Sequence, residues 1–180
     1  MEEAIAELIN MTRVSIALVL VLVVGVGCKS YLSKLSFDTS YSPPADWKIV
    51  QDGKWGLQFH VPSSVSAEGH MDNPRWIHEG TNLRVIVDFG GKFAQESLRQ
   101  KKNYVEARMN FNGLDALVCS YDDDASRGNQ PFPKRMALYF LKSRSAVAPG
   151  SEPSFVVEYA SDRERTPALQ ILQTVRFFNS

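Results

Sequence analysis

Alternating apolar residues mark two hairpins in the middle of the chain. After Asp52-Gly53, apolar side chains occupy every second position of the segment 55–61, with polar or small residues between them. A second alternating segment, 105–111, ends at Asn112-Gly113. A period of two is typical of a strand with one buried face, and Asp-Gly and Asn-Gly favour two-residue hairpin turns. The pattern therefore predicts two antiparallel hairpins.

Three later segments contain apolar residues at neighbouring positions, and so on both faces of a strand: 114–121, 136–141 and 155–159. Strands that are apolar on both faces are typical of central positions in a sheet that is covered on both sides. Shorter strands are expected at 75–79, 83–89 and 175–178.

Helical patterns are fewer. A short helix is expected over 94–102, and the segment 168–175 carries apolar residues at helical spacing after Ser161 and Glu164, which form a capping-box pair. Together the elements predict an α+β domain over residues 47–180. We expect a single, mostly antiparallel sheet of about six or seven strands, covered by two or three helices.

The N-terminus contains an uncharged apolar run, Val14–Gly27, directly after Arg13. As a helix this run spans about 21 Å, less than the roughly 30 Å of a bilayer core, and so favours a signal peptide. It ends at Gly25-Val26-Gly27-Cys28, which resembles the lipobox of bacterial lipoproteins, although that family usually has Leu at the place of Gly25. The resemblance implies that the Cys28 thiol receives a diacylglyceryl group and tethers the protein to a membrane.

Two alternatives remain for this segment: a signal peptide that is cleaved without lipidation, and an uncleaved anchor that begins near Leu8. Translation can begin at Met1 or at Met11, and the latter places Arg13 directly before the apolar run. We therefore divide the chain into a signal peptide or anchor (1–28), a linker rich in Ser and Pro (29–46) and the globular domain. Leu32, Leu35 and Phe37, within the linker, can contact either the membrane or the domain.

Charge narrows the range of partners. The chain has 20 Lys and Arg against 20 Asp and Glu. Binding of nucleic acid normally requires a basic excess, so we expect no nucleic-acid partner. The N-terminus instead predicts association with a membrane, with the domain facing the periplasm or the exterior and a protein of the cell envelope as its partner.

The residues that could support chemistry are few. Asp122, Asp124 and Ser126 begin like a calcium loop, but Pro133 stands where the closing Glu would be, so we expect an acidic loop and no metal. The histidines lack metal-ligand spacing and are expected at the surface or at strand edges. Cys119, in an apolar strand, is expected to be buried and unreactive. The tryptophans are expected in the core, and if one is exposed, we expect it to be Trp76.

One family resemblance covers most of residues 47–178. The segments GLQFHVP (56–62), NGLDALV (112–118) and ALQILQTVRF (168–177), in this order, resemble the PsbP-like α/β sandwich superfamily. The resemblance implies an accessory, assembly or docking role and gives no catalytic residues to transfer to this chain. We expect no cofactor. The leading hypothesis is a non-catalytic binding or assembly domain. The alternative is a hydrolase or metal-dependent enzyme with a site assembled from dispersed residues such as His60, His78 and Asp122.

Overall fold

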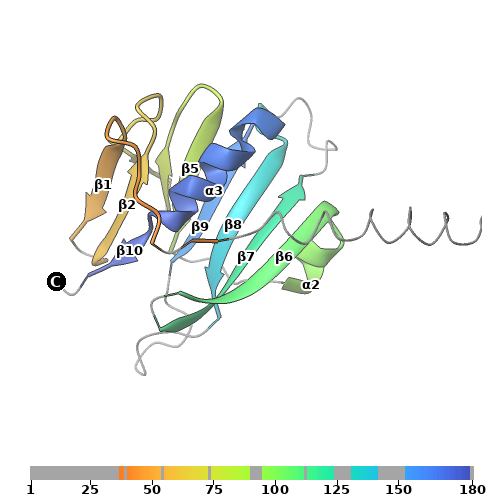
Figure 1. Cartoon of the computed structure of the whole chain (residues 1–180). Helices are drawn as coiled ribbons and strands as arrows, with labels where there is room; N and C mark the ends of the chain where they lie inside the picture. Colours follow the sequence, from red (N-terminus) through yellow and green to blue (C-terminus); the bar gives the residue numbers. More distant parts are fainter. Residues whose placement is uncertain are drawn as a thin grey trace, which may run out of the picture. The chain divides into compact units, whose positions relative to one another are not determined.

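The computed structural model describes residues 37–38, 40–53, 55–72, 74–89, 95–111, 113–123, 131–141 and 153–178. These residues belong to one compact unit, Phe37–Ser180 (Figure 1). The apolar run and Cys28 lie outside the described residues.

A seven-stranded antiparallel sheet forms the body of this unit. The strand order is β3-β4-β5-β9-β8-β7-β6, and every pairing in it is antiparallel. The bounds are β3 (His70–Asp72), β4 (Arg75–His78), β5 (Leu83–Asp88), β6 (Lys102–Phe111), β7 (Leu114–Asp122), β8 (Lys134–Phe140) and β9 (Ser154–Tyr159). The three segments that are apolar on both faces are β7, β8 and β9. They occupy interior positions of the sheet, as predicted.

A second, three-stranded sheet has the order β1-β2-β10. Its strands are β1 (Lys48–Asp52), β2 (Leu57–Val61) and β10 (Arg176–Phe177). The alternating residues of β2 bury one face of this sheet against the large sheet. The ring of Phe59 lies 5.8 Å from that of Phe155 in β9 and 6.4 Å from that of Trp76 in β4.

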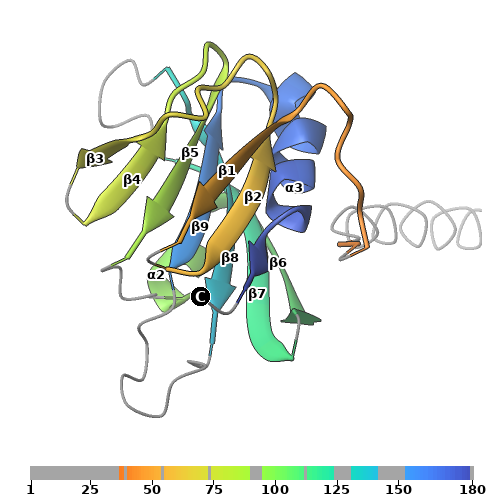
Figure 2. The same cartoon turned by 90° about the vertical axis from the view of Figure 1, so that its left-hand side faces the viewer.

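The small sheet and helix α3 (Arg165–Gln173) cover the same face of the large sheet (Figure 2). The helix contacts β8, β9 and β2, and it buries Ala168, Ile171 and Leu172. The predicted capping box is confirmed, because Ser161 and Glu164 cap the 3-10 turn Asp162–Glu164 that leads into α3. On the opposite face, Leu98 of helix α2 (Gln95–Arg99) packs against a buried cluster of Cys119, Tyr121 and Ala137.

The predicted α+β class, with a single sheet under two or three helices, is wrong, because the described residues are mostly β-strand. The described residues form two sheets, and only α3 among their helices has seven or more residues. The period of two shows correctly that one face of β2 is buried, but it does not specify what buries it. Here the β1–β2 hairpin, closed by β10, is itself a covering layer and takes the place of a helix.

The two predicted hairpins both form, with different turns. Phe111 pairs with Leu114, so residues 112–113 make the predicted two-residue turn, and Gly113 has φ +86°. In the first hairpin Asp52 pairs with Leu57, which leaves a four-residue connection. Among its described residues, Gly56 and not Gly53 has a positive φ, so the predicted turn at Asp52-Gly53 is wrong.

Candidate functional site

The three residues of the enzyme hypothesis, His60, His78 and Asp122, do not lie close to one another. His78 lies on β4 and Asp122 on β7, with β5, β9 and β8 between them in the sheet. Four strand spacings correspond to about 19 Å. His60 follows Phe59 in β2 and therefore points to the opposite side of that strand from the Phe59 ring, which contacts His78. The structure brings none of the three side chains together with another.

His78 is buried and not at the surface, which corrects the expectation for this histidine. Its side chain has 0% exposure, and its Nδ1 lies 3.1 Å from the carbonyl oxygen of Ser66. Because a carbonyl oxygen only accepts, Nδ1 donates and Nε2 is left as an acceptor, buried without a hydrogen-bond partner among the described residues. Burial lowers the pKa of His78, so the neutral ring belongs to the folded state.

Trp76 also departs from its prediction. It is half-buried, and its ring packs 4.3 Å from that of His78. The exposed tryptophan is Trp55, which stacks on Phe89 at 4.5 Å with 37% of its surface exposed.

Asp122 is held by neighbouring side chains and not by a metal-ligand group. Lys134 Nζ lies 3.3 Å from Asp122 Oδ1, and Asn103 Nδ2 donates to Asp122 Oδ2 at 2.6 Å. Asp124 and Ser126, the other oxygens of the calcium-like pattern, lie outside the described residues. Within the described ranges, no three residues among His, Cys, Asp and Glu are placed to hold a metal ion.

The prediction of burial is confirmed for Cys119, which has 0% exposure. Burial, with a contribution from the charge of Glu106, raises the pKa of its thiol to about 12. Since the thiolate is the nucleophilic form, this thiol is not suited to covalent catalysis near neutral pH.

A row of paired charges crosses the face of the large sheet opposite α3. Glu158 of β9 is paired in register with Arg84 of β5 on one side and Arg135 of β8 on the other. Arg84 Nε lies 2.5 Å from Glu158 Oε2, and Arg135 Nη2 lies 2.7 Å from Glu158 Oε1. Both oxygens of a carboxylate that is only 3% exposed are therefore engaged by guanidinium groups.

The row continues past β8. Arg135 Nη2 lies 2.9 Å from Asp123 Oδ2, and Lys101 Nζ lies 3.1 Å from Asp123 Oδ1. Burial disfavours the charged form of Arg135, but Glu158, Tyr121 and Asp123 outweigh it, and the pKa of Arg135 rises above its ordinary value. Opposite charges alternate along the whole row, although Arg135 Nε is buried without a hydrogen-bond partner among the described residues.

Sequence reasoning missed this row. Arg84 and Glu158 each interrupt an otherwise apolar strand, which is a visible signal of a buried charge that needs a partner. The partners themselves are 74 residues apart in the chain and become neighbours only through the register of β5 with β9.

The comparisons with known proteins give no family assignment: no protein-family model matches the chain, and no curated protein matches it. Across the part of the chain that the structure describes, no helix has the length and apolar character needed to span a bilayer.

Proposed function

We propose that the chain is a membrane-tethered, extracytoplasmic protein whose domain binds or helps to assemble other envelope components and does not catalyse a reaction. The tether is supported by the apolar run Val14–Gly27 and by the lipobox-like end at Cys28. The non-catalytic role is supported by the geometry of the domain and by the resemblance to the PsbP-like superfamily.

The observation that carries the non-catalytic role is the internal use of the reactive groups. The Cys119 thiol is buried with a raised pKa, and Glu158 has both oxygens engaged by arginines. A general acid, base or nucleophile must instead reach a substrate atom. Glu158 is thus occupied by its neighbours in the sheet, and the Cys119 thiol is not available to a substrate.

Exposed apolar side chains favour a binding role. Ile49 is 57% exposed on β1, and Met71 is 63% exposed on β3. Both strands lie at sheet edges, where unpaired backbone groups can accept an added strand. Large apolar side chains at such edges are a candidate contact surface for a protein partner.

The tether is tested by Cys28→Ser in cells that produce the full chain. We expect an unprocessed precursor and the loss of labelling by a fatty-acid analogue, because the acyl acceptor is gone. Cys119→Ser is the matched control and should keep the label, since that thiol is buried in the domain. A wild-type chain that is found in the cytosol, unlabelled and with its leader intact, would overturn the proposed location.

The binding role is tested with a photo-crosslinking amino acid in place of Met71 in the membrane-bound chain. We expect one discrete adduct with an envelope protein, and much less of it from the neighbouring position His70, which points to the opposite face of β3. Absence of adducts from both Met71 and Ile49, together with hydrolytic turnover by the purified chain that is lost in Asp122→Asn, would replace the proposal with the enzyme hypothesis.

A further inference from the structure

Strand β6 is the longest strand of the described part and lies at the end of the large sheet (Figures 1 and 2). One side of it pairs with β7 in unbroken register over Val105–Phe111, after an irregularity between Lys102 and Val105. No strand of the described residues pairs with its other side. An edge of this length can take up a further strand unless its side chains prevent it.

The side chains of β6 alternate between two kinds. Val105, Ala107 and Met109 are half-buried and apolar, and they share the face that carries α3. Glu106 and Arg108 lie on the other face and carry opposite charges. Proline is absent from the strand, and the only irregularity lies at its start. The strand is thus protected from indiscriminate pairing by the irregularity at its start and by three charged residues, Lys102, Glu106 and Arg108.

We propose that β6 pairs antiparallel with β6 of a second copy of this chain, about a two-fold axis at Ala107, and joins the two large sheets. In this register Ala107 lies opposite Ala107, and Val105 lies opposite Met109. Glu106 lies opposite Arg108 of the second copy, and the symmetry repeats that pair on the other side of the axis. Opposite charges and apolar pairs in direct cross-strand positions stabilise an antiparallel sheet.

The charges select this register over its neighbours. An axis at residue 106 would place Glu106 against Glu106, and an axis at residue 108 would place Arg108 against Arg108. Like charges directly opposite each other destabilise a strand pair. Of these three adjacent registers, only the one centred on Ala107 puts an opposite charge across from each of the two residues.

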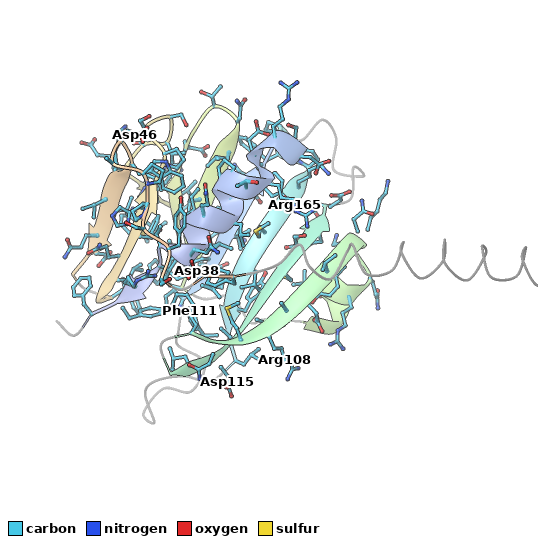
Figure 3. All side chains as sticks on the ribbon, in the orientation of Figure 1. Asp38, Asp46, Arg108, Phe111, Asp115 and Arg165 are labelled. Atoms are coloured by element: carbon cyan, nitrogen blue, oxygen red, sulfur yellow. The ribbon has the colours of Figure 1, made fainter. Side chains whose placement is uncertain are left out.

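The two charged residues have the environments that this contact needs. Arg108 is exposed and points outward from β6 (Figure 3), and no carboxylate of the described residues lies within ion-pair distance of it. Glu106 is held in place by Arg99 Nη2 at 2.5 Å and by the hydroxyl of Tyr104, which donates at 2.6 Å. Both oxygens of Glu106 therefore already have partners within the chain, and Arg108 of the second copy would be a further donor to this carboxylate. This inference does not depend on the proposed function.

The register is tested by disulfide formation in the full chain under mild oxidation. Ala107→Cys should give a covalent dimer, because directly opposite residues have Cα atoms about 4.5–5.5 Å apart, within disulfide range. Asn110→Cys is the matched control on the same exposed strand. In the proposed register two Asn110 residues are about 20 Å apart along the sheet and should not join. The unsubstituted chain controls for Cys28 and Cys119.

The charges are tested by a reversal cycle, with the dimer dissociation constant of the detergent-solubilised full chain measured by sedimentation equilibrium. Arg108→Glu places a carboxylate opposite Glu106 of the second copy and should weaken the dimer about tenfold. Adding Glu106→Arg restores opposite charges across the axis and should recover part of the loss, because it also removes the partner of Arg99 within each copy. The midpoint of urea denaturation, measured for each variant at concentrations where it is monomeric and compared with that of the unsubstituted chain, checks that the fold is intact.

Three results would overturn the proposal. They are equal crosslinking from Ala107→Cys and Asn110→Cys, a dimer that is insensitive to Arg108→Glu, and an Ala107→Cys adduct with a different protein in place of a second copy.

Discussion

At the scale of single residues, the domain depends on charges that lie within apolar strands. A buried carboxylate is tolerated only when charged and hydrogen-bonding partners replace the water that it loses. Glu158 obtains such partners from Arg84 and Arg135 on the two neighbouring strands. The sequence shows that these three strands contain charged residues, but only the register of the strands shows which of these residues pair.

Replacing Glu158 by alanine should lower the free energy of unfolding by about 3 kcal/mol, because two arginines lose a shared, nearly buried partner. Urea denaturation of the full chain measures the change. Arg75→Ala is the matched control, since Arg75 is 53% exposed in its ion pair with Asp88 and should change stability by less than about 1 kcal/mol. Equal effects of the two substitutions would show that the buried row contributes no more than a surface pair.

His78 makes stability depend on pH. Burial lowers its pKa below the ordinary 6.5, so the unfolded chain takes up a proton at a higher pH than the folded one. The contribution of His78 is therefore fully present above about pH 6.5 and is lost as the pH falls through the lowered folded pKa. Burial also lowers the pKa of His60, which adds to the loss in the same direction.

We expect His78→Phe to reduce this acid-side loss while retaining that of His60. At pH 7.5 the variant should be less stable by about 1 kcal/mol, because the Ser66 hydrogen bond is gone, and the difference should shrink by pH 5. Urea denaturation at the two pH values measures both quantities. A difference that is the same at both pH values would contradict a buried, neutral His78.

At the scale of elements, close backbone approaches define how the strands join. Gly56 has φ +59°, and a Cβ added there would overlap the carbonyl oxygen of Phe178, whose N–H donates to Gly56 O at 2.8 Å. Gly113 also has a positive φ, but nothing lies within 4 Å of an added Cβ. A comparison of substitutions at the two glycines therefore distinguishes the cost of backbone strain, present at both, from the cost of a steric overlap, present only at Gly56.

Gly113→Ala should lower the free energy of unfolding by about 1 kcal/mol, the effect of an alanine in the left-handed region alone. Gly56→Ala should lower it by a further 1–3 kcal/mol or so, because β10 must also move away from β2. Urea denaturation of both variants tests the difference. Equal effects would mean that the end of the chain adapts without loss.

Element prediction from the sequence succeeded where the signals are local. The capping box at Ser161 and the two-residue turn at Gly113 depend on residues three or fewer positions apart. The predicted helix over 94–102 is shorter, ending at Arg99, because the residues from Lys102 onward pair with β7. Pairing across the sheet overrides a weak helical preference.

At the scale of the whole molecule, one face of the large sheet is covered by a mixed layer of α3 and the small sheet. The hydroxyl of Thr174, directly after α3, accepts from the backbone N–H of His60 at 2.9 Å and so ties the helix to β2. Phe37 packs its ring 5.8 Å from that of Phe111, which shows that this linker residue contacts the domain. The contact decides between membrane and domain for Phe37, whereas Leu32 and Leu35 lie outside the described residues.

The sequence by itself determined the positions of both hairpins, the capped C-terminal helix, the burial of Cys119 and most of the strands, though not β3, because each follows from side-chain period, turn residues or local apolarity. Only the tertiary structure decided that two sheets form, that Arg84, Glu158 and Arg135 make one row, and that His78 and Asp122 lie far apart. The reason is physical: strand register and the choice of covering layer depend on contacts between residues distant in the chain.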